Sequence, residues 1–320
     1  MALGDMTVFN SFAYEAFTET VTQQVRLFNE ASAGTLTLRP ARNIGDFDEE
    51  AFYALIPGLV RRRDAYGTGN VSPVDLAQLQ RNSVKVAGGS VPVRWTPQQF
   101  SWVQLNQEEA GTAIGTQFAE GVFQDYLNSA ITAVRPAIAN AASGSLVYDA
   151  TDGVLGLTDL VEGCKVFGDR SDRIAAWIIH SKPMHDLWVQ TISNANDLFQ
   201  FGNVKIMQDG FGKRFIMTDS PALVTAGSPD TYHTVGLTAG GAMVEDNGDF
   251  FSYVDTSNGT ENILRTWQAE YTFNLGLKGY SWDQANGGAS PTNAELGTGT
   301  NWDQIATDIK DTAGVVVNSQ

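Results

Sequence analysis

Hydrophobic and polar residues alternate along this chain with two different periods. Apolar side chains recur every three or four positions between residues 9 and 28, and again between residues 108 and 142. That spacing predicts two amphipathic helices, the second of about eight turns. From residue 266 to residue 278 every second side chain is apolar, which predicts a long strand with one buried face. We expect the longer helix to pack against this strand.

Shorter elements are predicted between the long helix and the long strand. In chain order these are a helix from residue 158, a strand over 174–179, a helix over 181–190, a hairpin of 204–207 with 212–219, and strands over 232–238, 242–244 and 250–254. Such a mixture indicates a compact region of strands and helices. The chain is therefore expected to have an α+β fold.

Two N-terminal segments carry helix signals. The polar face of the helix over 9–28 has Arg26 as its only base, whereas a helix lying on a membrane surface would carry many. We expect this helix to dock onto another protein surface. A second helix is expected over 46–60, because Asp46 can cap it and Glu49 follows three residues later.

Two further segments are expected to leave the body of the protein. Residues 82–103 are typical of a hairpin whose turn lies at 87–90, and Pro92 and Pro97 restrict it to a sheet edge. Its apolar content is too low for a core, so we expect it to be stable only on a neighbouring molecule. The tail from residue 283 is rich in Gly, Asn and Thr, and it is expected to be loosely ordered or to dock elsewhere, with a short helix near 302–309.

Charge is distributed unevenly along the chain. The net charge is −16, but residues 61–105 hold six bases and two acids, a net charge of +4. The bases are Arg61, Arg62, Arg63, Arg81, Lys85 and Arg94. This basic segment could contact nucleic acid or the acidic face of another copy. The bulk negative charge repels a polyphosphate, so contact between subunits is the favoured hypothesis for these six residues.

Residues that could carry chemistry are few. Cys164 is the only cysteine, which excludes a disulfide within the chain and makes a Cys/His zinc site improbable. His180 and His185 are five positions apart, where a helical zinc pair needs four. No nucleophile elbow or phosphate-binding loop occurs. We expect no catalytic site, metal or cofactor. With no secretory signal and no apolar run long enough to span a bilayer, we expect synthesis in the cytoplasm and no membrane partner.

Several phrases of the sequence resemble a known family. They are residues 47–52 (FDEEAF) with 61–67 (RRRDAYG), 83–86 (SVKV) with 92–95 (PVRW), 279–283 (GYSWD), and 301–303 (NWD) with 311–315 (DTAGV). Together with the order of the predicted elements, they resemble the major capsid protein of tailed bacteriophages and prophages that has the Hong Kong 97 shell fold. The resemblance covers nearly the whole chain.

This resemblance implies a division of the chain. It would comprise an N-terminal arm (1–60), an extended loop with a β-hairpin (61–105), a peripheral domain (106–145 with 258–282), an axial domain (146–257) and a C-terminal tail (283–320). The implied function is that of a non-enzymatic subunit, which forms hexamers and pentamers of an icosahedral head around double-stranded DNA. It would be assembled in the host cytoplasm, with separate scaffold, portal or decoration proteins as further partners, and become part of the virion.

Two other interpretations remain open. An encapsulin-type compartment would use the same fold to hold a cargo enzyme in place of DNA. An unrecognised enzyme could use paired Asp and Glu side chains, and a deep pocket with converging carboxylates would support it.

Overall fold

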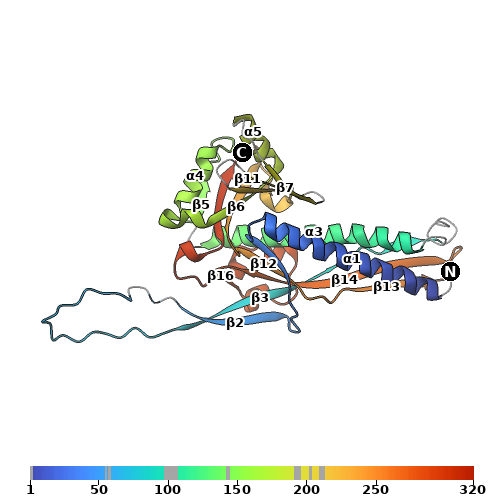
Figure 1. Ribbon diagram of the computed structural model, residues 1–320, viewed down its shortest axis with the longest axis horizontal. Coiled ribbons are helices and arrows are strands. Elements are labelled where there is room, and N and C mark those ends of the chain that lie inside the picture. Colours follow the sequence, from blue (N-terminus) through green and yellow to red (C-terminus); the bar gives the residue numbers. More distant parts are fainter. Residues whose placement is uncertain are drawn as a thin grey trace.

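The computed structural model describes residues 3–54, 56, 59–96, 107–141, 145–190, 196–201, 204–208 and 213–320. The molecule is elongated, with a compact region rising from the middle of one side (Figure 1). The N-terminus lies at one end of the long axis, and a thin loop projects from the other end. The chain therefore presents two distant ends and a central body.

The elongated region is built on a seven-stranded sheet. Its strand order is β1-β12-β14-β3-β2, and β13 and β4 also pair with β14. Only the β1–β12 pair is parallel. The strands are β1 (Leu36–Pro40), β2 (Phe47–Tyr53), β3 (Gln78–Gly89), β4 (Val93–Trp95), β12 (Ala242–Asp246), β13 (Phe251–Ser257) and β14 (Leu264–Leu277).

Two long helices, α1 (Leu3–Ala31) and α3 (Gln107–Asn140), run beside this sheet. They lie very close together at two glycines of α3. A Cβ atom on Gly111 would lie 2.6 Å from the carbonyl oxygen of Phe9, and one on Gly115 only 2.4 Å from that of Ala13. Each glycine costs about 1 kcal/mol of helix propensity relative to alanine. Glycine is required at these two positions because a side chain there would collide with the backbone of α1.

The compact region is built on an eight-stranded sheet of order β5-β17-β11-β6-β9-β8-β7, with β10 beside β11. Its strands are β5 (Val147–Asp149), β6 (Ile174–Ile179), β7 (Asn196–Phe201), β8 (Val204–Gln208), β9 (Arg214–Met217), β10 (Val224–Thr225), β11 (Thr231–Thr238) and β17 (Gly314–Ser319). Its helices are α4 (Leu157–Lys165), α5 (Ser181–Gln190) and the 3-10 helices η2 (Gly168–Arg173) and η3 (Pro221–Leu223).

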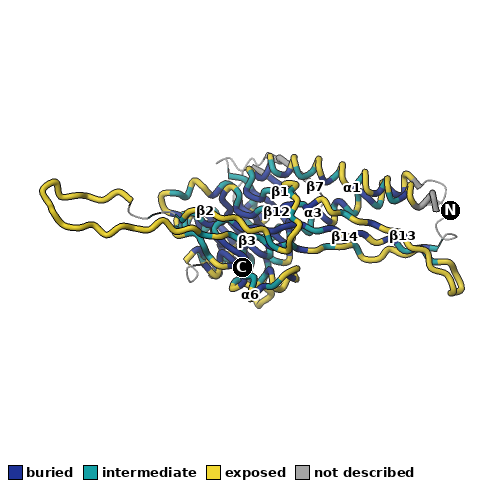
Figure 2. Tube along the Cα trace, turned by 90° about the horizontal axis from the view of Figure 1, so that it is seen from below, coloured by how far each residue is buried: buried dark blue, intermediate teal, exposed yellow. Residues whose placement is uncertain are grey.

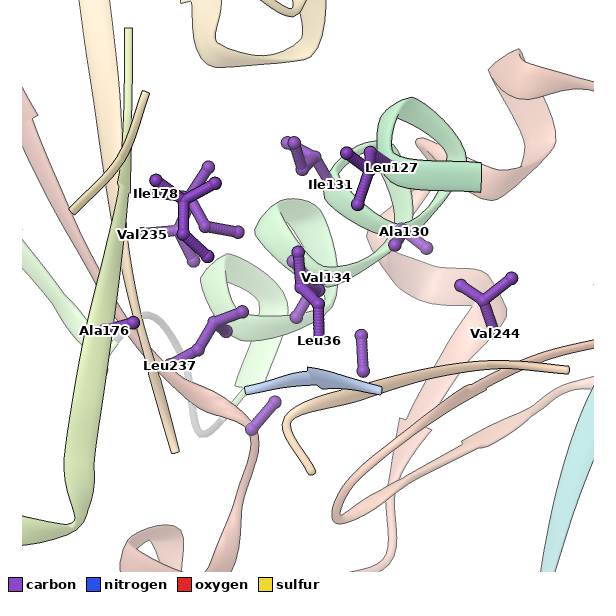
Figure 3. Close-up of a cluster of buried hydrophobic side chains, with 14 of the residues drawn as sticks. Leu36, Leu127, Ala130, Ile131, Val134, Ala176, Ile178, Val235, Leu237 and Val244 are labelled. Atoms are coloured by element: carbon purple, nitrogen blue, oxygen red, sulfur yellow. The ribbon is translucent and has the colours of Figure 1, made fainter. Parts of the chain in front are cut away.

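The last part of the chain joins the two regions. It contains β15 (Tyr280–Trp282), α6 (Gln284–Gly287), α7 (Asn293–Leu296), η4 (Gly299–Asn301), β16 (Trp302–Gln304) and η5 (Ile309–Asp311). Helix α3 contributes to one core shared with both sheets: Val134 and Ile131 lie between Leu36 and Val244 of one sheet and side chains of the other (Figure 3). The other sheet contributes Ala176, Ile178, Val235 and Leu237.

Most of the elements expected from periodicity are confirmed. The two long helices appear as α1 and α3, and the alternating segment appears as β14, whose inner residues Tyr271, Phe273 and Leu275 are buried. The predicted helix from residue 158 appears as α4, and the strand over 174–179 and the helix over 181–190 appear as β6 and α5. The later strands and the β8–β9 hairpin are also present, although the turn of that hairpin lies outside the described residues.

The prediction for residues 82–103 is wrong. Strands β3 and β4 do not pair with each other; both pair with β14 of the same chain, as Val84↔Leu275 and Val93↔Trp267 show. Two successive strands along one side of β14, interrupted around Pro92, therefore take the place of the hairpin. This segment has few apolar residues of its own, but strand β14 of the same chain pairs with it. It therefore folds onto its own monomer. Residues 97–103 lie outside the described part.

Three other expectations need correction. The segment expected as a helix over 46–60 begins with strand β2, which pairs with β3 from Phe47↔Val84 to Tyr53↔Gln78. Helix α1 docks onto α3 of its own chain and so does not form a free arm. The tail is not loosely ordered, and the other alternative, that it docks elsewhere, is the one that agrees with the structure: β17 lies between β5 and β11, and its Val315–Val317 run is buried. In place of the helix near 302–309 the chain forms β16 and then η5.

Candidate assembly surfaces

A long hairpin loop projects from the seven-stranded sheet. Strands β2 and β3 pair in continuous register, and the last contact before the loop joins Ala54 N–H to the carbonyl oxygen of Ala77 at 2.9 Å. We call residues 54–77 the hairpin loop. Its base is fixed by the ladder, whereas the described residues of its distal part form no strand. The loop extends well beyond the body of the protein (Figure 1).

The hairpin loop is solvent-exposed throughout its distal part. Every residue from 59 to 77 is exposed, as the outer end of the molecule shows in Figure 2. Val60 is 93% exposed and Tyr66 is 96% exposed. The exposed apolar residues are Leu59, Val60, Tyr66, Val71, Val74 and Leu76. These six side chains place apolar surface of the loop in water.

Three of the six predicted contact residues lie on this loop. Arg61, Arg62 and Arg63 are exposed, and the described part of the chain gives them no ion pair. Asp64 follows them, and its carboxylate accepts a hydrogen bond from Tyr66 N–H at 3.0 Å, which shapes a turn. The loop therefore presents basic and apolar side chains together.

The other three predicted residues are not brought together with the loop arginines. Arg81 lies at the base of the hairpin and forms an ion pair with Glu50 across the β2–β3 ladder. Lys85 is half-buried on β3, opposite Asn274 of β14. Arg94 is exposed on β4, near the far end of β14. The sequence thus identified a basic segment, but the fold distributes it over four places: the loop, the base of the hairpin, the part of β3 beside β14, and β4.

Arg94 borders a second exposed surface, which the sequence did not reveal. Strand β13 pairs with β14 so that Phe251, Tyr253 and Asp255 lie opposite Glu270, Gln268 and Thr266. Together with Arg94 and Ser257 these side chains line an open groove of about 410 Å³. We call it the distal groove. Apolar side chains lie on both faces of β13, Phe251 and Tyr253 on one and Val254 on the other, and the sequence does not decide which face is exposed.

Two half-buried carboxylates, those of Asp125 and Asp246, bear on the enzyme interpretation. The Asp125 carboxylate on α3 accepts a hydrogen bond from the Tyr271 hydroxyl on β14 at 2.7 Å. Burial raises the pKa of Asp125, and burial also raises the pKa of Asp246. A groove of about 400 Å³ beside α1 is lined by Asp246 as its one carboxylate, among mainly apolar residues. Asp125 thus links helix α3 to strand β14, whereas Asp246 accepts a hydrogen bond from Gly248 N–H at 2.9 Å, and Asp125 is not among the described residues that line this groove.

Metal-ligating side chains and long apolar helices would indicate other classes of protein. Among them, no group of three or more His, Cys, Asp or Glu side chains could hold a metal ion. None of the described helices is both long and apolar enough to cross a membrane. The described residues thus define a class of architecture: an elongated α+β body with a long, exposed loop of basic and apolar side chains.

Comparison with known proteins gives this class a family. The model of the major capsid protein 13-like (Gp13-like) family matches residues 5–316, and the chain belongs to this family. The protein is therefore a structural component of a capsid shell and of a virion. A search of curated proteins finds no match.

Solved phage capsids share the fold. The chain is similar to a subunit of the cyanophage Pam1 capsid, with 11% identity, 92% of this chain and 91% of that chain covered, and a TM-score of 0.53. It is also similar to the capsid of Ralstonia phage GP4 (8% identity, 91% and 90% covered, TM-score 0.50) and of Myoviridae phage XM1 (9%, 90% and 90%, TM-score 0.50). The predicted α+β capsid fold is confirmed.

Proposed function

We propose that this chain closes the icosahedral head of a bacteriophage around double-stranded DNA, and that the hairpin loop is a principal contact between its copies. The observation that carries the proposal is the exposure of the loop in the monomer, with its apolar residues and three arginines lacking partners in the described chain. A neighbouring copy would supply those partners. Family membership and the shared capsid fold support the same role.

The structure suggests a revised division of the chain under this proposal. The extended loop would comprise residues 47–89, since β2 and β3 form its two strands. The peripheral domain would combine α1, α3 and the seven-stranded sheet, because these elements pack on one another. The axial domain would be the eight-stranded sheet, completed by β17 from the tail. Such domains would gather around the centres of hexamers and pentamers.

The charge of the subunit fits a container for DNA. A net charge of −16 disfavours wrapping of a polyphosphate by this chain, so packaged DNA would be enclosed without sequence-specific binding. The role would be non-enzymatic. Scaffold, portal or decoration proteins would be further partners, and assembly would take place in the host cytoplasm.

The proposal is tested by reversing the loop charges with Arg61→Glu, Arg62→Glu and Arg63→Glu together. We expect a folded subunit that no longer forms shells, because the reversed loop would be repelled by the acidic neighbour. A matched control reverses Arg26, Arg42 and Lys165, three exposed bases elsewhere, and keeps the net charge equal. Circular dichroism checks folding, and electron microscopy with sedimentation checks assembly. Normal particles from the loop variant would overturn the proposed contact.

A further inference from the structure

The groove beside helix α1 has the features of a small-molecule site. It has a volume of about 400 Å³ and is lined by residues of α1, α3, β1 and β12. Ligand pockets in proteins are typically of this size and mainly apolar, with a few polar groups that hold one part of the ligand. We call it the α1 groove. Its apolar and aromatic lining residues are Val21, Val25, Leu38, Pro40, Tyr126 and Val244.

Two side-chain oxygen groups lie together in this lining. The Asp246 carboxylate accepts a hydrogen bond from Gly248 N–H at 2.9 Å, and in the described residues it forms no ion pair. Tyr126 lies beside it and is only 1% exposed, and its hydroxyl reaches normal hydrogen-bond geometry with no atom of the described chain. Buried polar atoms in proteins nearly always have a partner, so this hydroxyl indicates a bound group.

The electrostatics around Asp246 favour a cation as that group. Burial raises the pKa of Asp246, and the neighbouring Asp249 carboxylate also raises it. Both effects disfavour the ionised carboxylate, and a positive group beside it would oppose them. An ammonium group has three donors and no acceptor, so it can donate one hydrogen bond to Asp246 and another to the Tyr126 oxygen. It would satisfy both groups at once.

Two arginines limit the charge that the α1 groove accepts. Arg39 lines it but already forms an ion pair with Glu245. Arg26 lies on an exposed position of α1, and the described residues give it no ion pair. Arg26 would repel a second positive charge on the ligand, whereas a hydrocarbon chain can lie along Val21 and Val25. One ammonium group on a short hydrocarbon chain therefore fits better than a diamine.

Two other open sites match this chemistry less well. A cleft of about 350 Å³ at the base of the hairpin is bordered by Glu50 and Asp311, which already pair with arginines of the chain. The carboxylates of the distal groove, Asp255 and Glu270, are exposed to solvent. Of these three sites, the α1 groove alone combines a half-buried acid with a buried hydroxyl that has no partner in the described residues.

We propose that the α1 groove binds a primary alkylammonium ion. The ammonium group lies between Asp246 and Tyr126, and the hydrocarbon chain lies against the apolar residues of α1 and β1. This binding does not depend on the assembly role proposed for the hairpin loop, so either proposal can fail without the other.

The test measures binding of n-butylammonium to unassembled full-length subunits by isothermal titration calorimetry. We expect a single saturable site, and a loss of affinity of about tenfold or more in Asp246→Asn, because a hydrogen bond to a charged group is removed. Tyr126→Phe, which keeps the ring, should lose about two- to tenfold. Asp255→Asn removes one negative charge from another surface and is the matched control, which should bind like the wild type. Circular dichroism checks that each variant folds.

A comparison of ligands separates this site from general attraction of cations to an acidic protein. A net charge of −16 attracts the doubly charged diamine putrescine more strongly than n-butylammonium. The α1 groove predicts the reverse order, and weaker binding of uncharged n-butanol than of n-butylammonium. The proposal is overturned if n-butylammonium shows no saturable binding, if putrescine binds more tightly, or if Asp246→Asn binds like the wild type. If Asp246→Asn does not fold, Tyr126→Phe decides in its place, and unchanged affinity there overturns the proposal.

Discussion

The aromatic seam and the hairpin loop place similar residues in opposite environments. The seam is formed by Phe17, Phe118, Tyr126, Trp267, Tyr271 and Phe273, which pack between the two long helices and β14. The loop carries Leu59, Val60 and Tyr66 almost entirely in water. The described residues bury most of the first set and leave the second set exposed. Under the proposed function, such exposed apolar residues would lie where another copy binds.

The largest expected effect comes from the seam. Phe273 is completely buried, and its ring centroid lies 4.8 Å from that of Tyr126. Phe273→Ala should lower the free energy of unfolding by about 3–5 kcal/mol, because it removes a buried ring and leaves a cavity. Leu59→Ala on the loop should change it by less than about 0.5 kcal/mol. Urea unfolding of unassembled subunits measures both, and equal losses would contradict the contrast.

A smaller effect is expected at the helix contact. Gly115→Ala places a Cβ atom against the backbone of α1, and should cost about 1–3 kcal/mol through overpacking. Gly121→Ala, on the same helix, meets no atom within 4 Å, and should raise stability by about 1 kcal/mol through helix propensity. Thermal unfolding of the two variants compares them. A stabilising Gly115→Ala would show that α1 does not lie so close to α3.

The smallest effect concerns pH. Burial raises the pKa of Asp125 in the folded state above its ordinary value of 3.8, so folding favours the protonated form. This contribution is fully present below the ordinary pKa and is lost as pH rises through the folded pKa. From neutral pH downwards, the wild type should therefore gain stability relative to Asp125→Asn.

Asp169 provides a control of opposite sign. Its contact with Lys310 lowers the pKa of this exposed carboxyl, so its contribution is present above the ordinary pKa and is lost as pH falls. The wild type should lose stability relative to Asp169→Asn on acidification. Urea midpoints between pH 3 and 7 measure both differences. If the urea midpoints of the wild type and of Asp125→Asn change with pH in the same way, burial does not raise the pKa of Asp125.

Periodicity correctly predicted the elements whose own sequence shows which face is buried. The apolar residues of α3 recur at helical spacing and those of β14 at every second position, so each set lies on one face of its element. Both elements were predicted correctly. Residues 46–53 failed this test, because Phe47 and Phe52 flank three consecutive exposed acids and follow neither period clearly. Pairing with β3 decided for the strand.

The candidate surfaces were predictable in part. The basic composition of residues 61–105 pointed to the loop arginines, but not to the pairing of Arg81 with Glu50 or to the separation of Arg94 from the loop. The distal groove was missed because β13 has large side chains on both faces. Val254 and Phe251 are both apolar, and only docking of one face onto the body leaves the other exposed.

The sequence alone determined the long helices, the long strand, the compact mixed region and the uneven charge, since each depends on periodicity or composition within a short segment. Tertiary structure decided which segments became partners. It paired β3 and β4 with β14 of the same chain, placed α1 on α3, and inserted β17 between β5 and β11. The physical reason is that backbone hydrogen-bonding groups and apolar faces can pair with any complementary segment. Only the packed molecule determines which segment lies close enough to pair.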